Sequence, residues 1–198
     1  MFIVDDDVQY LRAIERLLRA SGYQVVTYTS AAGFLKKLTP DTAGCLITDL
    51  MMPGMDGMAL QEALHGSGNL LPVLFLSGQG DIPTTVRAMR GGAEDFLTKN
   101  APKADLIAAV NRALARNEEE RAKRARLEEL RKSFELLTSR ELEILRHVLK
   151  GQLNKQIAAD LDIHERTVKL HRTSITTKLR VHSVAELTRM AQQAGLFE

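Results

Sequence analysis

Five short apolar runs alternate with helix-forming segments over the first 115 residues, and this alternation constrains the fold more than any other feature. Each run has the length of a strand and precedes a segment with helical spacing or a helix-starting residue. Such alternation predicts a parallel, doubly wound sheet with right-handed crossovers. The runs are MFIV at 1–4, QVVTYT at 24–29, CLITDL at 45–50, PVLFLS at 72–77 and EDFLTK at 94–99.

Four of these runs end in polar residues that can take part in chemistry. Asp5 and Asp6 follow the first run, while Asp49, Ser77 and Lys99 end the third, fourth and fifth. In a doubly wound sheet the functional crevice lies outside the carboxyl ends of the strands, so these residues are expected to converge. Carboxylates with a hydroxyl and an ammonium suit a divalent cation and a phosphoryl group, because Mg²⁺ prefers carboxylates, waters and phosphate oxygens.

Each of these residues also has a simpler structural explanation. The run Asp5–Asp7 can cap the first helix, and Asp49 can be a turn residue before MMPG. Ser77 and Lys99 are uninformative when each is taken alone. The combination favours a binding site, because a structural explanation requires four strand ends to carry suitable residues by coincidence.

From Leu136 onwards the pattern is helical throughout. Thr138 and Glu141 form a capping-box signature before an apolar helix that ends at Gly151, and Asn154 is expected to cap the next short helix. A tight turn then leads to a basic segment, which predicts a helix-turn-helix, although the charges alone also suit a solvated helix face. The basic residues of that segment are Arg166, Lys169, His171, Arg172 and Lys178.

The segment between these regions has the features of one long helix. No Gly or Pro occurs between Pro102 and Gly151, and residues 116–126 contain no apolar side chain larger than alanine. We therefore expect a helix from about Ala104 to about Leu136, solvated all round where it bridges two domains. An apolar stripe then returns, suited to packing on the second domain or on a partner: Leu127, Leu130, Phe134 and Leu137.

Composition limits the location of the protein and its class. No apolar run approaches the roughly 18 residues that span a bilayer, and the start lacks signal-peptide features. The single cysteine, Cys45, excludes an intramolecular disulfide and agrees with a reducing compartment, so a cytoplasmic location without membrane contact is expected. The net charge of +2 is too small to establish nucleic-acid binding by itself.

The motifs VDDD, LITDLMMPGMDG, FLSGQGD and FLTK, in this order, resemble the receiver domain of two-component response regulators. The resemblance covers residues 1 to about 115 and implies a flavodoxin-like fold with Asp49 as phosphoacceptor. It implies that Mg²⁺, or Mn²⁺, is held by Asp5, Asp6, Asp49 and the Met51 carbonyl. It also implies that Ser77 and Lys99 bind the phosphoryl group and that Phe96 changes exposure on activation. Asn100 departs from the family, in which proline usually follows the lysine.

The C-terminal stretch LTSRELEIL…G…NKQIAADL…TVKLH…KL is similar to the LuxR-type helix-turn-helix. By this resemblance the major groove is met by Lys169, Leu170 and Thr173. Other residues would mostly touch backbone phosphate, and the final helix would dimerise. Asp162 and His164 depart from the family, which usually has glycine in the turn and a serine-like cap. The phosphate-contacting residues would be Lys155, Arg166, Thr167, His171 and Arg172, with Lys178 as a further basic residue of the same helix.

Together the two resemblances imply a response regulator of the FixJ/NarL group. Its domains would be a receiver at 1–115, a helical linker at 116–135 and a DNA-binding domain at 136–198. A sensor histidine kinase would phosphorylate Asp49, and the homodimer would bind promoter DNA, with RNA polymerase as a further candidate partner. The chain would be a regulator and not an enzyme. The alternatives are a Mg²⁺-dependent phosphohydrolase and a receiver-like dimerisation module that is never phosphorylated.

Overall fold

The computed structural model describes residues 1–78 and 82–196, and within them one parallel sheet has the strand order β2-β1-β3-β4-β5. This is the flavodoxin-like order, so the predicted fold class is confirmed. Each strand lies within the apolar run that predicted it. The strands are β1 (Phe2–Val4), β2 (Val26–Tyr28), β3 (Leu46–Thr48), β4 (Val73–Ser77) and β5 (Asp95–Thr98). Residues 79–81 of the motif FLSGQGD lie outside the described residues.

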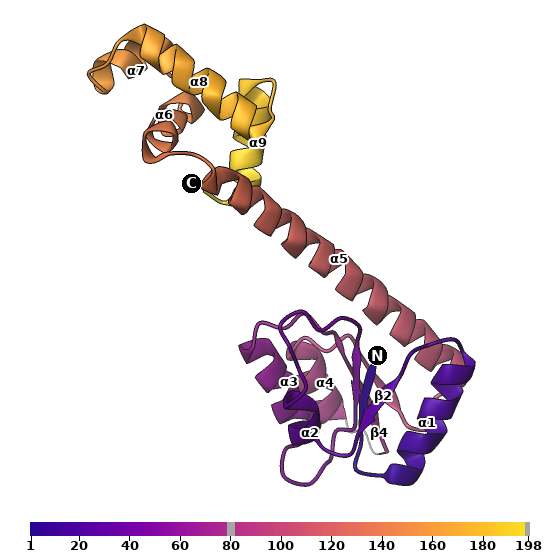
Figure 1. Cartoon of the computed structure of the whole chain (residues 1–198). Coiled ribbons are helices and arrows are strands. Elements are labelled where there is room, and N and C mark those ends of the chain that lie inside the picture. Colours follow the sequence, from indigo (N-terminus) through magenta and orange to yellow (C-terminus); the bar gives the residue numbers. More distant parts are fainter. Residues whose placement is uncertain (79–81, 197–198) are drawn as a thin grey trace. The chain divides into compact units, whose positions relative to one another are not determined.

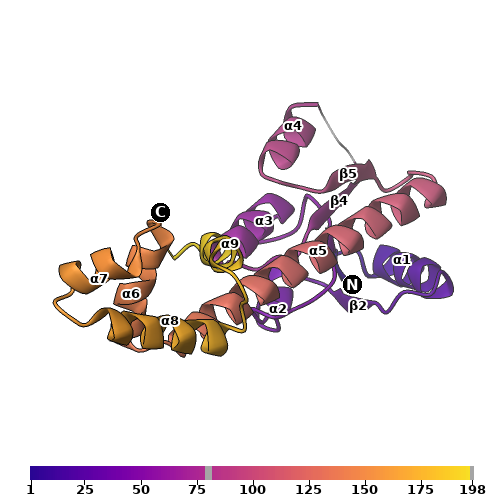
Figure 2. The same cartoon turned by 90° about the horizontal axis from the view of Figure 1, so that it is seen from above.

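Helices cover both faces of this sheet. On one face α1 (Val8–Ala20) and the first turns of α5 (Lys103–Glu135) lie side by side (Figures 1 and 2). The other face is covered by α2 (Ala31–Leu35), α3 (Gly57–Gly66) and α4 (Ile82–Arg90) (Figure 1). The central strands β3 and β4 are therefore buried on both sides and β1 nearly so, which is why they read as continuous apolar runs, whereas the edge strands β2 and β5 are partly exposed.

Each face of the sheet has its own apolar core. Successive residues of a strand point to opposite faces, so Ile3 packs with Leu11 and Leu106 on one side. Val4 packs with Phe34 and Leu60 on the other side. Because both faces of the central strands are covered by apolar side chains, polar side chains can gather at the carboxyl edge of the sheet.

The predicted long helix is confirmed as α5, which has 33 residues. The prediction that residues 116–126 are solvated all round is wrong at Asn117, which is buried. Its side chain accepts a hydrogen bond from the Gly44 N–H at 2.9 Å and donates one to the Leu70 carbonyl at 2.7 Å. Asn117 satisfies two loop backbone groups, and composition alone did not reveal such a role for a polar residue.

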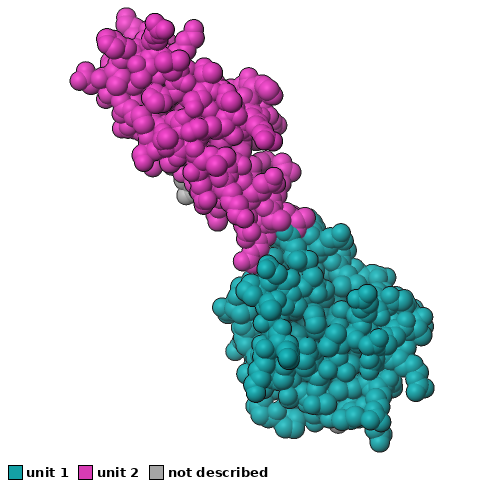
Figure 3. All heavy atoms as spheres, viewed as in Figure 1, with its two compact units in different colours: residues 1–121 teal, residues 122–198 magenta. Residues whose placement is uncertain are grey.

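The chain divides into two compact units, residues 1–121 and 122–198, each described here by itself (Figure 3). The second unit is helical, and its core contains residues of the predicted apolar stripe, Phe134 and Leu137, together with Ile144 and Ile175. Its helices after α5 are α6 (Ser139–Leu149), α7 (Asn154–Asp160), α8 (Glu165–Leu179) and α9 (Val184–Ala194).

Helix ends in the second unit follow the sequence signals with one correction. Thr138 and Glu141 form the predicted capping box of α6. Asn154 does not cap α7: the cap position is Leu153, whose N–H donates to Gln156 Oε1 at 2.8 Å. The helix starts one residue earlier than predicted because Gln156 supplies the oxygen, which leaves the Asn154 side chain free to accept from Arg172 at 2.8 Å.

The turn between α7 and α8 accommodates both departures from the LuxR pattern. Asp162 has φ of 51°, a left-handed conformation that Asp tolerates better than most residues. His164 occupies the cap position of α8 without a side-chain cap hydrogen bond. Within the part of the chain that the structure describes, no helix is both long and apolar enough to cross a membrane.

Candidate functional site

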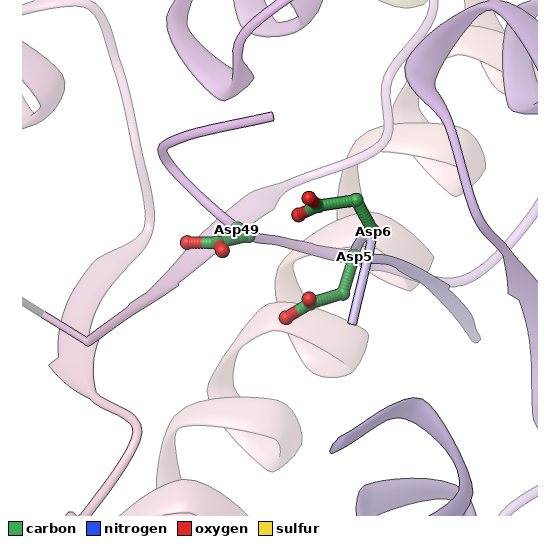
Figure 4. Close-up of side chains that lie close together, drawn as sticks. All are labelled: Asp5, Asp6 and Asp49. Carbon is green, nitrogen blue, oxygen red and sulfur yellow. The ribbon is translucent and has the colours of Figure 1, made fainter. Parts of the chain in front are cut away.

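The polar residues predicted at the strand ends gather at the carboxyl edge of the sheet. Asp5 follows β1 and Asp49 follows β3, the neighbouring strands at which the strand order switches direction. Figure 4 shows the side chains of Asp5, Asp6 and Asp49 close together. One carboxylate oxygen from each of the three lies within 4.8 Å of the others.

The acidic run Asp5–Asp7 divides between two tasks. Asp5 is buried, with 1 % of its surface exposed, whereas Asp6 and Asp7 are exposed. Asp7 caps α1, because its Oδ1 accepts from the N–H groups of Gln9 and Tyr10 at 2.9 and 3.1 Å. The capping explanation is therefore correct for Asp7, while Asp5 and Asp6 belong to the acidic cluster.

Lys99 connects the two buried carboxylates of this cluster. Its Nζ lies 2.6 Å from Asp5 Oδ2 and 2.9 Å from Asp49 Oδ2. The same ammonium lies 4.5 Å from the centre of the Tyr10 ring, within range of a cation–π interaction. Sequence reasoning did not predict Tyr10; the only signal was an aromatic in the first turn of the helix that follows the acidic run.

Burial and hydrogen bonds oppose each other at the charged groups of this cluster. Burial raises the pKa of Asp5 from its usual value, although hydrogen bonds from Lys99 and the Asp7 N–H oppose this. Burial lowers the pKa of Lys99, but its bonds to Asp5 and Asp49 outweigh that effect and leave it raised. Three carboxylates against one ammonium leave an excess of negative charge that a divalent cation would neutralise.

The donor set fits Mg²⁺ or Mn²⁺. Asp5, Asp6 and Asp49 offer carboxylate oxygens close enough to share one ion, and the exposed Asp6 leaves the cluster accessible to water and phosphate. A hard cation prefers such oxygen ligands. Bound there, it would neutralise charge on a phosphoryl group.

Asp49 is held in place by the backbone around it. Its Oδ1 accepts from the Leu50 N–H at 2.6 Å and lies 3.5 Å from the Met51 N–H. Gly57 begins α3 so close to this segment that an added Cβ would lie 2.2 Å from the Asp49 carbonyl oxygen. Gly57 is therefore required for the close approach of two backbone segments.

The other predicted residues of this site are placed at its border. Ser77 ends β4 and is buried, and its carbonyl accepts from the Lys99 N–H at 2.8 Å. Phe96, on β5, is half-buried and stacks on Phe75 with ring centres 5.9 Å apart. The Met51 side chain is exposed.

The second unit carries a separate candidate surface on α8. A groove of about 680 Å³ lies between the start of α7 and α8, and it brings together Lys155, Lys169, Arg172 and Thr173. Leu170 is exposed nearby on the same helix, with 65 % of its surface accessible. A Leu that is exposed among basic residues suits apolar contact with base edges while the basic side chains contact phosphates.

Not all predicted DNA-binding residues lie on that face. Arg166 is exposed, whereas Thr167, His171 and Lys178 are half-buried. Lys178 points to a partner within the protein: its Nζ lies 2.7 Å from Glu141 Oε2 on α6. Helical geometry already indicated this difference. Lys178 lies nine positions after Lys169, which is about 2.5 turns and places the two side chains on opposite sides of α8.

Family models match both units. Residues 1–111 match the response regulator receiver domain, and residues 135–191 match the bacterial regulatory proteins of the luxR family. Among curated relatives, the response regulator protein TodT of Pseudomonas putida is 40 % identical over 193 residues, covering 98 % of this chain and 85 % of TodT. The transcriptional regulatory protein FixJ of Azorhizobium caulinodans is 39 % identical over 194 residues, covering 98 % and 92 %.

Solved structures agree with this assignment along the whole chain. The response regulator StyR is 41 % identical with a TM-score of 0.89, and the match covers 97 % of both chains. Full-length FixJ from B. japonicum is 31 % identical with a TM-score of 0.59, covering 100 % of this chain and 97 % of FixJ. The chain therefore belongs to the transcriptional response regulators of two-component systems, in which a receiver domain precedes a LuxR-type DNA-binding domain.

Proposed function

We propose that Asp49 accepts a phosphoryl group from a sensor histidine kinase and that this controls DNA binding by the second unit. Asp49 is the nucleophile: its carboxylate oxygen forms a bond to phosphorus while the bond from phosphorus to the kinase histidine nitrogen breaks. The observation that carries the proposal is the convergence of Asp5, Asp6 and Asp49 with the Lys99 ammonium at one sheet edge.

The surrounding residues would have distinct tasks in this transfer. Asp5, Asp6, Asp49 and the Met51 carbonyl would hold Mg²⁺ or Mn²⁺. Lys99 would pair with the equatorial phosphoryl oxygens, so the catalysis is mainly positioning and electrostatics.

Phosphorylation of Asp49 would then change the contacts of two further receiver residues. The Ser77 hydroxyl would hydrogen-bond the phosphoryl oxygens once they are present. Phe96, half-buried against Phe75, would change its exposure as the switch.

The position of Asp7 argues against the phosphohydrolase alternative. That alternative requires Asp5 and Asp7 to act together on a substrate, yet the Asp7 carboxylate caps α1 by accepting from the Gln9 and Tyr10 N–H groups. The alternative of a receiver that is never phosphorylated leaves the Lys99 bridge and the acidic cluster without a use.

For the second unit we propose that the outer face of α8 reads promoter DNA. Lys169, Leu170 and Thr173 would contact bases, because they lie exposed on that face. The remaining basic and hydroxyl side chains would hold phosphates, which positions the helix without specifying sequence. These are Lys155, Arg166, Thr167, His171 and Arg172. Lys178 is assigned a different task below.

Phosphorylation would promote a homodimer that binds two half-sites, in the cytoplasm where kinase and promoter meet. Contact with RNA polymerase would follow at the promoter. In this role the chain catalyses only its own phosphorylation and dephosphorylation.

Labelling with a small phosphodonor and Mg²⁺, followed by mass spectrometry of the intact chain, tests the site. Wild type should gain one phosphoryl group, Asp49→Asn none, and Asp6→Ala should react more slowly because the metal is held less well. Asp56→Asn is the matched control, since Asp56 is an exposed cap of α3 and Asn caps equally well. Labelling of Asp49→Asn at the wild-type rate would refute the assignment.

A further inference from the structure

Glu141 is a buried carboxylate of the second unit that the proposed function does not use. Only 4 % of its surface is exposed, although it lies in the first turn of α6. Buried carboxylates are rare in proteins unless they are paired and hydrogen-bonded. Its contacts therefore require an explanation beyond the capping box that the sequence predicts.

Three donors from two helical segments surround this carboxylate. Ser174 Oγ donates to Oε1 at 2.6 Å, while the Thr138 N–H and Lys178 Nζ each donate to Oε2 at 2.7 Å. Burial would raise the pKa of Glu141, but bonds from Lys178, Ser174 and Thr138 lower it to about 2. Glu141 is therefore fully ionised at neutral pH and both of its oxygens are in use.

The two donors on α8 lie one turn apart on the same side of the helix. Ser174 and Lys178 are four residues apart, so both can reach one carboxylate only at one axial position and one rotation of α8. Ile144 and Ile175 share the apolar core between α6 and α8, and apolar contacts are not directional. Hydrogen bonds to a buried charge are directional, and fixing register is the best-attested use of such groups.

We propose that Glu141 and Lys178 position the recognition helix. The ion pair between them holds α8 so that Lys169, Leu170 and Thr173 present a defined face to DNA. In this proposal Lys178 pairs with Glu141 and does not bind phosphate. The inference rests on the proposed function of α8. Glu141 and Lys178 are positioning residues, since neither would touch DNA.

The test uses the phosphorylated full chain and a duplex that the wild type selects from random sequence. Affinities for this duplex and for random DNA are measured over a range of salt concentrations. Lys178→Met keeps an unbranched side chain, one heavy atom shorter, and removes its charge. It should lower the ratio of specific to random affinity by about tenfold, with the slope of log affinity against log salt unchanged. Arg166→Ala, a phosphate contact, should instead reduce the magnitude of that slope by about one.

The double variant Glu141→Gln/Lys178→Met separates positioning from stability. It leaves no unpaired buried charge, so the second unit should regain thermal stability. Because Gln and Met cannot form the ion pair of Glu141 and Lys178, the ratio of specific to random affinity should stay low. If the double variant regains both its thermal stability and the wild-type ratio of specific to random affinity, the inference is wrong. It is also wrong if Lys178→Met reduces the slope of log affinity against log salt as Arg166→Ala does. Failure of the wild type to prefer any duplex would instead refute the proposed function.

Discussion

Each unit of this protein contains a buried carboxylate bonded to a lysine, and the two carboxylates behave in opposite ways. In the receiver, Asp5 lies 2.6 Å from Lys99, and burial leaves its pKa raised. In the second unit, Glu141 lies 2.7 Å from Lys178, and its pKa is lowered to about 2 because hydrogen bonds outweigh burial. The distance to the lysine therefore does not explain the difference.

The explanation is the balance between burial and hydrogen bonding at each carboxylate. Burial outweighs the hydrogen bonds at Asp5, and the nearby charge of Asp49 adds to the rise of its pKa, whereas hydrogen bonds outweigh burial at Glu141. The two lysines also differ in how many negative groups share them. Lys178 serves Glu141, whose two oxygens also accept from Ser174 and Thr138. Lys99 divides its charge between Asp5 and Asp49, with the carboxylate of Asp6 close by. A satisfied charge holds structure together, whereas an incompletely neutralised cluster can bind a cation and a phosphoryl group.

The largest expected difference between the two units is in how their stability responds when the lysine of each is replaced. Lys178→Met should destabilise the second unit by roughly 2–3 kcal/mol, because it leaves the buried Glu141 carboxylate with one donor fewer, and Mg²⁺ should not change this loss. Lys99→Met should destabilise the receiver, and millimolar Mg²⁺ should reverse part of the effect, because a cation from solvent can replace the ammonium. Hydrogen exchange followed peptide by peptide measures the two units separately. Equal losses that Mg²⁺ leaves unchanged would contradict the comparison.

Acidification should weaken the second unit through Glu141. Its pKa is about 2 in the folded protein against an ordinary value of 4.5, so ionised Glu141 stabilises the fold fully above pH 4.5. This contribution is lost as the pH falls from 4.5 towards 2. Urea titrations followed by NMR at several pH values should show the loss in amides of α8. Glu141→Gln should remove that component, and an unchanged pH dependence in the variant would show that other carboxyls cause it.

Mg²⁺ should stabilise only the receiver. A cation that binds the folded acidic cluster at tenfold excess over its Kd adds about 1.4 kcal/mol to the unfolding free energy. Asp6→Ala should remove this gain. Hydrogen exchange with and without Mg²⁺ is the measurement, with α8 amides as the internal control. Protection of α8 equal to that of β4 would show that the ion does not act through the cluster.

The smallest expected difference concerns the helix caps beside each carboxylate. Asp7→Ala in the receiver and Thr138→Ala in the second unit should each lower stability by about 1 kcal/mol. In both variants the backbone N–H that donates to Asp5 or Glu141 remains. Chemical denaturation should therefore give similar values for the two. If Thr138→Ala lowers the unfolding free energy as much as Lys178→Met does, the Thr138 hydroxyl contributes to the interaction between Glu141 and Lys178.

Predictions from the sequence succeeded where a local pattern controls the outcome. Apolar runs at strand length and spacing specify buried parallel strands, and the strand ends then bring Asp5, Asp49, Ser77 and Lys99 to one edge. The long α5 helix followed from the absence of Gly and Pro. These features depend on residues close in sequence or on rules that hold for every doubly wound sheet.

The sequence by itself determined the fold class, the order of the two units and the residues at the strand ends. Only the tertiary structure decided which partners the polar groups have. Asn117 is buried against loop backbone, Gly57 permits close approach to Asp49, and Lys178 pairs with Glu141 rather than facing outward. A charge has the same sequence signal on a solvated face and in a buried pair. The role of a charged side chain depends on which groups, distant in sequence, lie beside it in the low-dielectric interior. Only tertiary packing brings those groups together.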